Sequence, residues 1–364
     1  MGLNRCIIHI GAGKTGSSSI QGLLAAYPES LAEQGVAFLG RMLEQHKHLQ
    51  QLPCAPWQRN GGWPQWLAAA ETLSEAYAER LEDQLNALEE RGIHTVIISN
   101  EGLLPHVEAF RPVVERLAER GLAVDAVAVL RRHYEWAFSA YVQWAIRHKT
   151  NPGRVLSFRQ WLDRKPPCFA PPLQAWRDCP GVRQLLLINY SAVDDVVPAF
   201  LSRLGLQLPY PDGRTERANP AASLLEALVL ATYNDHQDGP AHPTEANGLL
   251  ERLQAMQHVG RADTNLNWPG TQDFDLQELV AVCAADLAAT NGLLEADGQP
   301  PFADAEQQPP MIPSSLRSLE ISSQSRQDEL LAALLSIVIH MDQELRAQQQ
   351  VLAQVRRKLR QQST

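Results

Sequence analysis

The sequence lacks any run of about 18 consecutive apolar residues, the length that a membrane-spanning helix requires. We therefore expect no transmembrane segment. The stretch from Met1 to Arg5 is too short for the apolar core of a signal peptide. A myristoylation signal needs Ser or Thr where this chain has Cys6, so we expect no lipid anchor either.

Positive charge is also scarce. The chain has 32 Lys and Arg residues against 41 Asp and Glu residues, which gives a formal net charge of −9. Proteins that coat nucleic acids need a basic surface to displace counterions from phosphates, so this balance argues against a nucleic-acid partner. It leaves room for a local basic pocket that binds a smaller anion.

Cysteine is sparse and widely spaced. The five cysteines are odd in number, and no two of them form a Cys-x-x-Cys pair. This pattern argues against a disulfide framework and against a zinc site, and it favours a reducing compartment. We expect a cytoplasmic protein in which Cys6 and Cys283 are small buried hydrophobic residues.

The chain does contain short apolar runs that alternate with helical patterns. The runs predict buried strands at 6–10, 94–99, 124–130 and 184–189. Helical periodicity covers 18–26, 73–90, 113–120, 134–145 and 193–204, whereas 34–66 has an irregular composition. Strands alternating with helices predict an α/β fold, a P-loop-like three-layer αβα arrangement with a central, mostly parallel sheet.

The last part of the chain has a different composition. A proline-rich segment begins near Gln299 and predicts a linker. Beyond it, apolar residues follow heptad spacing for about four heptads: Leu331, Leu334, Val338, Met341, Leu345, Leu352, Val355 and Leu359, with Gln348 in the same series. We predict a domain at 1–298, a linker at 299–325 and a helical tail at 326–364. The tail would form a coiled coil and a homo-oligomer, or else an amphipathic helix packed back on the domain.

The most informative motif is the loop between the first strand and the first helix. Gly11, Gly13 and Gly16 allow a close backbone approach, Lys14 supplies a positive charge, and several hydroxyl groups follow. Backbone N–H groups and the helix dipole bind anions in this setting. The alternative is an ordinary glycine-rich turn with an exposed lysine. The Walker pattern requires another glycine where this chain has Ile8, so the loop is too short for it.

A second motif follows the strand at 124–130. Arg131 comes directly after the strand, and Ser139 lies on the next helix, so the two side chains could hold one phosphate together. Without the loop motif, the alternative of two ordinary surface residues would be favoured.

Together the two motifs resemble the sulfotransferase superfamily, whose donor is 3′-phosphoadenylyl sulfate (PAPS). The sequence around both motifs most resembles that of bacterial members, and the resemblance covers roughly residues 1–210. The resemblance implies a 5′-phosphosulfate loop, a 3′-phosphate site and a tyrosine near the adenine. The implied donor-binding residues are Gly13, Lys14, Thr15, Gly16, Ser17, Ser18, Ser19, Arg131, Ser139 and Tyr190.

The sequence departs from the family pattern in two places. Cytosolic members often carry a tryptophan where this chain has Ser19, and the Arg-Lys-Gly run of many members is absent. Both departures concern contacts on the adenine side of the donor.

Sulfuryl transfer is an in-line displacement in which positioning and charge stabilisation do most of the catalysis. Lys14 is suited to neutralise the charge that builds on the leaving phosphate, and no metal is required. The acceptor must lose a proton to a general base. The candidates are His48, then His46, both in the irregular stretch, and then Glu101 after the second predicted strand. The structural alternative for each histidine is an exposed loop residue, and for Glu101 it is a charge at a helix N-terminus.

Three functions remain open at this point. The first is a sulfotransferase acting on a hydroxyl or amine acceptor, in particular a carbohydrate, because Trp57, Trp63 and Trp66 could stack on sugar rings. Local packing is the alternative interpretation of these tryptophans. The second function is a P-loop kinase or nucleotide hydrolase, and the third is an inactive sulfotransferase-like scaffolding subunit.

Overall fold

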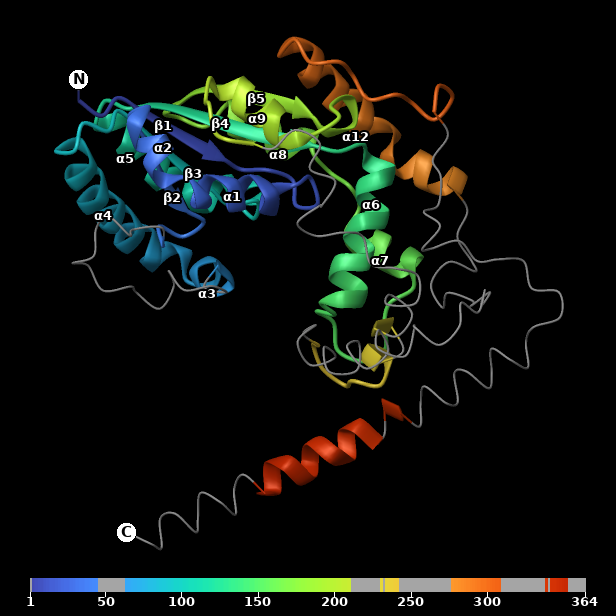
Figure 1. Cartoon of the computed structure of the whole chain (residues 1–364). Coiled ribbons are helices and arrows are strands. Elements are labelled where there is room, and N and C mark those ends of the chain that lie inside the picture. Colours follow the sequence, from blue (N-terminus) through green and yellow to red (C-terminus); the bar gives the residue numbers. More distant parts are fainter. Residues whose placement is uncertain are drawn as a thin grey trace, which may run out of the picture. The chain divides into compact units, whose positions relative to one another are not determined.

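The computed structural model describes residues 2–44, 63–210, 230–231, 233–241, 276–308, 338–339 and 341–352 (Figure 1). The chain divides into two compact units. The first unit consists of Met1–Trp136, Pro167–Pro220 and Leu279–Pro310. The second consists of Ala137–Pro166, Ala221–Glu278 and Met311–Thr364.

The first unit is built on a five-stranded sheet. Its strands are β1 (Arg5–His9), β2 (Val36–Gly40), β3 (Thr95–Ser99), β4 (Ala123–Leu130) and β5 (Val182–Asn189). The strand order is β2-β3-β1-β4-β5, and every neighbouring pair is parallel. The predicted α/β class with a parallel sheet is confirmed, and the central strands β1, β3 and β4 are almost wholly buried, as expected for a sheet covered on both faces.

Helices cover both faces of this sheet (Figure 1). One group, which packs together and onto β2, consists of α1 (Ser17–Ala26), α2 (Pro28–Glu33) and α9 (Val196–Leu204). The other group consists of α4 (Ala70–Glu89), α5 (Val107–Glu119) and α8 (Ala170–Arg177). The unit also contains α3 (Trp63–Ala68), the 3₁₀ turns η2 (Leu104–His106) and η4 (Tyr190–Ala192), and most of α12 (Leu276–Ala296).

Successive side chains of each strand point to opposite faces of the sheet, and each face has its own hydrophobic core. Ile7 of β1 and Val127 of β4 pack with Ile20, Leu24 and Phe200 from the helices of the first group. His9 and Ser99 have the same parity as Ile7 and Ile97, so their side chains lie on this same face. The alternation thus places two polar side chains at the end of an otherwise apolar layer.

The opposite face carries an aromatic cluster. Trp66, Tyr77 and Phe110 pack edge to face, and Trp176 lies beyond Phe110. Trp66 is fully buried, so for this residue the structure favours packing over sugar binding. Trp57 lies outside the described residues.

The strand β2 lies inside the stretch for which the sequence predicts irregular structure, and that prediction is wrong there. Val36, Phe38 and Leu39 are buried, and β2 pairs with β3 alone at the edge of the sheet. Its five residues equal the length of the central strands β1 and β3, and a short strand is common at a sheet edge.

The helix α12 is tied to the first unit by a partly buried carboxylate. Asp286 accepts hydrogen bonds from Phe169 N at 2.7 Å and Ala170 N at 3.1 Å, and its Oδ2 lies 2.6 Å from His133 Nε2. Burial alone would raise the pKa of Asp286, but the hydrogen bonds from these groups lower it below its usual value. Among the described residues, α12 is the one helix with the length and composition of a membrane span. Its length and composition alone are weak grounds for a span, since a helix packed within a protein passes the same test.

The segment that follows α12 contacts the same unit. Asn189 Nδ2 donates to Pro300 O at 2.8 Å, and Phe302 N donates to Asn291 Oδ1 at 2.8 Å. These contacts hold the first residues of the predicted linker. Its remainder lies outside the described residues, and the linker stays a prediction.

The second unit begins inside the helix α6 (His133–Tyr141), because the division falls after Trp136. A π-helical turn η3 (Val142–Arg147) and the helix α7 (Phe158–Arg164) follow. Phe138 stacks on Phe158 at 4.9 Å between ring centroids, and Tyr141 meets Phe158 edge-on at 5.2 Å. This cluster forms the described core of the second unit.

The predicted tail is described only around 338–352. Val338, Met341, Leu345 and Leu352 of the heptad series are exposed there. Gln348 is exposed as well, whereas Leu331, Leu334, Val355 and Leu359 lie outside the described residues, so the coiled coil stays a prediction.

Candidate anion-binding site at the end of the first strand

The loop after β1 lies at the carboxyl edge of the sheet, where parallel α/β folds bind their ligands. It continues along the neighbouring strand β4, because Ile10 N donates to Val127 O at 2.9 Å and Ala12 N donates to Val129 O at 3.1 Å. The central position of β1, between β3 and β4, therefore fixes the start of the loop from both sides.

The loop backbone is left-handed at three positions. The φ angles are 41° at Gly11, 71° at Lys14 and 86° at Gly16. A Cβ at Gly16 would lie 2.5 Å from Val196 Cγ1, so this position requires glycine. Lys14 lacks the conformational freedom of glycine, so its left-handed backbone lowers the stability of the fold by on the order of 1–3 kcal/mol. Strain of this kind is typical of functional sites, and here it falls on the residue that supplies the charge.

The helix α1 begins at the end of this loop without a side-chain cap. Its N-cap is Gly16, and in the described part of the chain no side chain accepts a hydrogen bond from the first turn. Thr15 donates its hydroxyl hydrogen back to Ala12 O, which tightens the loop. Ser17 Oγ is buried and has no hydrogen-bond partner among the described residues. The positive end of the helix dipole is thus left for a ligand.

Arg131 and Tyr190 lie beside the loop. The Arg131 guanidinium stands over the Tyr190 ring at 5.5 Å from its centroid, and its Nε donates to Glu135 Oε2 at 3.2 Å. The Tyr190 Cε2 atom is 3.7 Å from the position of a Cβ on Gly16. The Trp136 Nε1 atom also donates to Gly13 O at 2.9 Å. The structure therefore brings the loop, Arg131 and Tyr190 to one edge of the first unit.

The remaining predicted residues have different positions. Ser18 and Ser19 occupy the first turn of α1, where Ser18 is exposed and Ser19 half-buried. Ser139 lies on α6 beyond the boundary of the units, so it belongs to the second unit. His46 and His48 lie outside the described residues.

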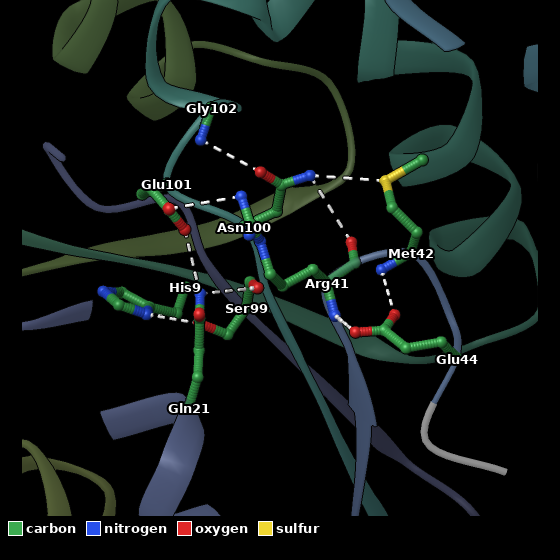
Figure 2. Close-up of polar contacts among 9 residues, drawn as sticks. All are labelled: His9, Gln21, Arg41, Met42, Glu44, Ser99, Asn100, Glu101 and Gly102. Carbon is green, nitrogen blue, oxygen red and sulfur yellow. Dashed lines mark hydrogen bonds and ion pairs between the residues drawn. The ribbon is translucent and has the colours of Figure 1, made fainter. Parts of the chain in front are cut away.

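Glu101 is the one predicted base that the structure describes. It follows β3, and its carboxylate is held at both oxygens (Figure 2). Arg41 Nη2 lies 3.2 Å from Glu101 Oε1, and Gln21 Nε2 donates to Glu101 Oε2 at 2.9 Å. A general base would have to accept a proton on an oxygen that already accepts from one of these groups.

The same network reaches two buried residues at the strand ends (Figure 2). His9 Nδ1 lies 2.7 Å from Ser99 Oγ, and Gln21 Nε2 donates to Ser99 Oγ at 3.2 Å and to Ser99 O at 3.1 Å. His9 is fully buried, and burial lowers its pKa to about 4, although the Glu101 charge acts in the opposite direction. His9 is therefore neutral at pH 7.

A tight turn closes the end of β2 against this network. Glu44 accepts hydrogen bonds from Arg41 N at 3.0 Å and Met42 N at 2.6 Å. Asn100 Nδ2 donates to Arg41 O at 3.4 Å, and Asn100 Oδ1 accepts from Gly102 N at 3.0 Å. The turn thus fixes the backbone from which the Arg41 side chain reaches Glu101 (Figure 2).

Within the described ranges, no group of three or more His, Cys, Asp or Glu side chains could hold a metal ion. Cys6, Cys179 and Cys283 are buried free thiols, and burial raises the pKa of Cys6 and of Cys283 to about 12. These two thiols are thus inert core residues.

The site includes residues that the sequence analysis did not single out, namely His9, Gln21, Arg41 and Ser99. The available signal was a polar residue at the end of an apolar strand run, as at His9 and Ser99. Their pairing depends on the register of β1 and β3, which joins His9 to Ser99 across the sheet.

Comparison with known proteins gave no match to this chain, neither among protein-family models nor among curated proteins nor among solved structures.

Proposed function

We propose that this chain is a soluble cytoplasmic sulfotransferase that moves a sulfuryl group from PAPS to a hydroxyl or amine acceptor, in the first instance on a carbohydrate. The observation that carries the proposal is the loop after β1, where Lys14 in a left-handed conformation precedes the uncapped N-terminus of α1. The residues of the two motifs support membership of the sulfotransferase superfamily, and the P-loop-like strand order of the sheet agrees with it.

The residues present fit the chemistry of such a donor. The N-terminus of α1 and Lys14 suit the 5′-phosphosulfate, and Ser17 Oγ is a buried hydroxyl that lacks a partner in the described part of the chain. Arg131, beside the Tyr190 ring, suits a phosphate near an aromatic base. Ser139 is proposed as its second phosphate contact. The donor would supply the sulfuryl group, and no metal is proposed.

In this proposal the bond between sulfur and the bridging phosphate oxygen breaks, while a bond forms between sulfur and the acceptor oxygen or nitrogen. Lys14 stabilises the negative charge that passes to the phosphate oxygen. A base takes the acceptor proton, and His48 or His46 is proposed for this role in preference to Glu101. Both Glu101 oxygens already accept hydrogen bonds, which argues for a positioning role.

A kinase or nucleotide hydrolase is the weaker alternative. Such an enzyme needs a carboxylate near the loop to hold Mg²⁺. Glu101 is the carboxylate that follows β3, and its two oxygens already interact with Arg41 and Gln21. The inactive scaffold is disfavoured because Lys14 carries backbone strain that a purely structural loop would not need.

The test is thermal stabilisation by ligands. We expect 3′,5′-adenosine bisphosphate to raise the melting temperature without Mg²⁺, and ATP with Mg²⁺ to raise it less. The Arg131→Ala variant should lose the response to the bisphosphate. Arg154→Ala serves as the charge-matched control, because the Arg154 side chain is 86% exposed and pairs with Asp235. A response to ATP with Mg²⁺ alone would favour the kinase, and no response to either ligand would favour the scaffold.

A further inference from the structure

His9 is a buried polar residue with no role in the transfer step outlined above. Its side chain is fully buried at the end of β1, and Nδ1 bonds to Ser99 Oγ (Figure 2). Its Nε2 atom has no hydrogen-bond partner within the described ranges. Buried nitrogen atoms are nearly always paired, so an unpaired one indicates a missing ligand or water.

The contacts of Ser99 favour one tautomer of the neutral His9 ring. Ser99 Oγ already accepts a hydrogen bond from Gln21 Nε2. A hydroxyl has a single hydrogen to donate, and within the described part of the chain His9 Nδ1 is the acceptor in its reach. When Ser99 donates to Nδ1, the neutral ring carries its hydrogen on Nε2. The unpaired atom is then a hydrogen-bond donor.

This donor faces the loop. A Cβ built on Gly11 would lie 3.2 Å from His9 Nε2, 3.2 Å from Ser17 Oγ and 3.3 Å from Glu101 Cβ. Two buried polar atoms, both without partners among the described residues, therefore flank one point beside the Gly11 backbone. Since each atom lies 3.2 Å from that point, the two atoms are at most about 6.4 Å apart, a separation that one oxygen placed between them, clear of the Gly11 backbone, can span with two hydrogen bonds.

We propose that His9 Nε2–H and Ser17 Oγ–H form a subsite that binds one anionic oxygen of a phosphate or sulfate group held by the loop. In its nucleotide form the inference rests on the proposed function, which identifies that group as the phosphosulfate of the donor. His9 adds a donor without adding charge, next to the charge of Lys14. The charge of the nearby Glu101 carboxylate is offset by its ion pair with the Arg41 guanidinium, which reduces its repulsion of the anion.

The first test observes the His9 ring directly in the full-length protein. With ¹⁵N-labelled histidine, NMR should show the hydrogen on Nε2, and the Nε2 signal should shift on addition of inorganic pyrophosphate or sulfate. A hydrogen on Nδ1 would overturn the inference. So would an unchanged Nε2 signal at pyrophosphate concentrations for which calorimetry shows binding.

The second test uses paired substitutions. His9→Leu removes the donor and should weaken binding of pyrophosphate and of 3′,5′-adenosine bisphosphate on the order of ten- to a hundredfold. His9→Gln, whose amide can place an N–H near the same point, should recover part of the affinity. His94→Gln is the matched control, because His94 precedes β3 at the opposite edge of the sheet and bonds to Thr95.

The outcomes separate the two proposals. If the nucleotide binds equally to the natural chain and to a folded His9→Leu variant, the subsite is wrong and the sulfotransferase proposal stands. If pyrophosphate shifts the Nε2 signal but the nucleotide does not bind, the subsite is supported and the proposed donor is wrong. Should His9→Leu fail to fold, the NMR measurement on the natural chain still decides.

Discussion

Two strand-to-helix connections at the carboxyl edge of the sheet differ in how far the polar groups at the start of the helix are paired within the chain. The chain runs from β5 into α9 through a connection that satisfies its own polar groups. Asn189 Oδ1 accepts from Ser191 N at 2.9 Å, and Asp195 Oδ1 caps the helix by accepting from Val197 N at 2.9 Å. Tyr210 Oη then donates to Asp195 Oδ2 at 2.6 Å.

The connection from β1 into α1 is left incomplete. Its N-cap is Gly16 without a side-chain bond, Lys14 is strained, and His9 Nε2 and Ser17 Oγ lack partners in the described part of the chain. Since both helices start at the same edge, the fold does not require this lack of caps. The difference shows where the sequence gives up local stability, which is the expected signature of a ligand site.

The largest effect should come from Lys14. We expect Lys14→Ala to reduce sulfuryl transfer by roughly a hundred- to a thousandfold or more, and donor affinity by less, because charge grows in the transition state. Single-turnover kinetics and calorimetry measure the two effects. Lys14→Gly should be equally inactive yet more stable than Lys14→Ala by about 1 kcal/mol, since glycine suits the positive φ angle. Near-normal turnover in either variant would refute the role of Lys14.

The acid response of the first connection should depend on His9. Above pH 6.5 the ring is neutral in both the folded and the unfolded chain, so it contributes no slope. Between pH 6.5 and about 4 the unfolded chain binds a proton that the folded chain does not, so stability falls as the pH falls. The loss amounts to about 3 kcal/mol in total. Urea unfolding over this pH range should show a smaller loss for His9→Leu, and curves of identical slope would contradict the buried neutral ring.

The predicted 3′-phosphate contacts should discriminate between ligands. Arg131→Ala and Ser139→Ala should weaken 3′,5′-adenosine bisphosphate about ten- to a hundredfold, because a charge-assisted bond to that phosphate is lost. Binding of adenosine 5′-phosphate should change much less. Isothermal calorimetry measures both, and equal losses for the two ligands would show that these side chains do not contact the 3′-phosphate.

Reciprocal substitutions at the two helix starts test the comparison itself. Asp195→Ala should lower the free energy of unfolding by about 1 kcal/mol through loss of the cap, with ligand affinity unchanged. Ser17→Ala should leave stability nearly unchanged, because its hydroxyl has no partner among the described residues, while anion affinity falls. Thermal melts and calorimetry provide the two readings. If Ser17→Ala cost more stability than Asp195→Ala, the first connection would be structural.

The smallest effect on either connection should come from the tail. Removing the residues after Pro313 should leave ligand binding unchanged and should alter the oligomeric state. The reason is that exposed apolar positions such as Met341 and Leu345 are typical of a surface that associates. Light scattering on the two forms measures this. Two monomers, with a lower melting temperature after truncation, would instead indicate a helix packed on its own domain.

The sequence predicted most of the sheet because each of the strands β1, β3, β4 and β5 contains a short apolar run. It missed β2, whose short run lies between a glycine and a polar, proline-rich stretch, where composition outweighed pattern. The loop with Lys14 and the neighbourhood of Arg131 could be predicted because each follows a strand end directly. The role of His9 could not, because its contact with Ser99 joins residues far apart in the chain and depends on strand register.

The central position of β1 has a consequence for how the protein is made. β1 leaves the ribosome well before its neighbours β3 and β4, and Ala12 needs Val129 to complete the loop. At ordinary rates of translation, roughly 5–20 residues per second, the strand waits about 6–25 seconds for its last neighbour. Until β3 emerges the apolar strand is unpaired on both edges, and until β4 emerges it stays unpaired on one edge. The nascent chain should therefore bind a chaperone at Cys6–Ile10 until β4 emerges, and the ligand site can form only after that release.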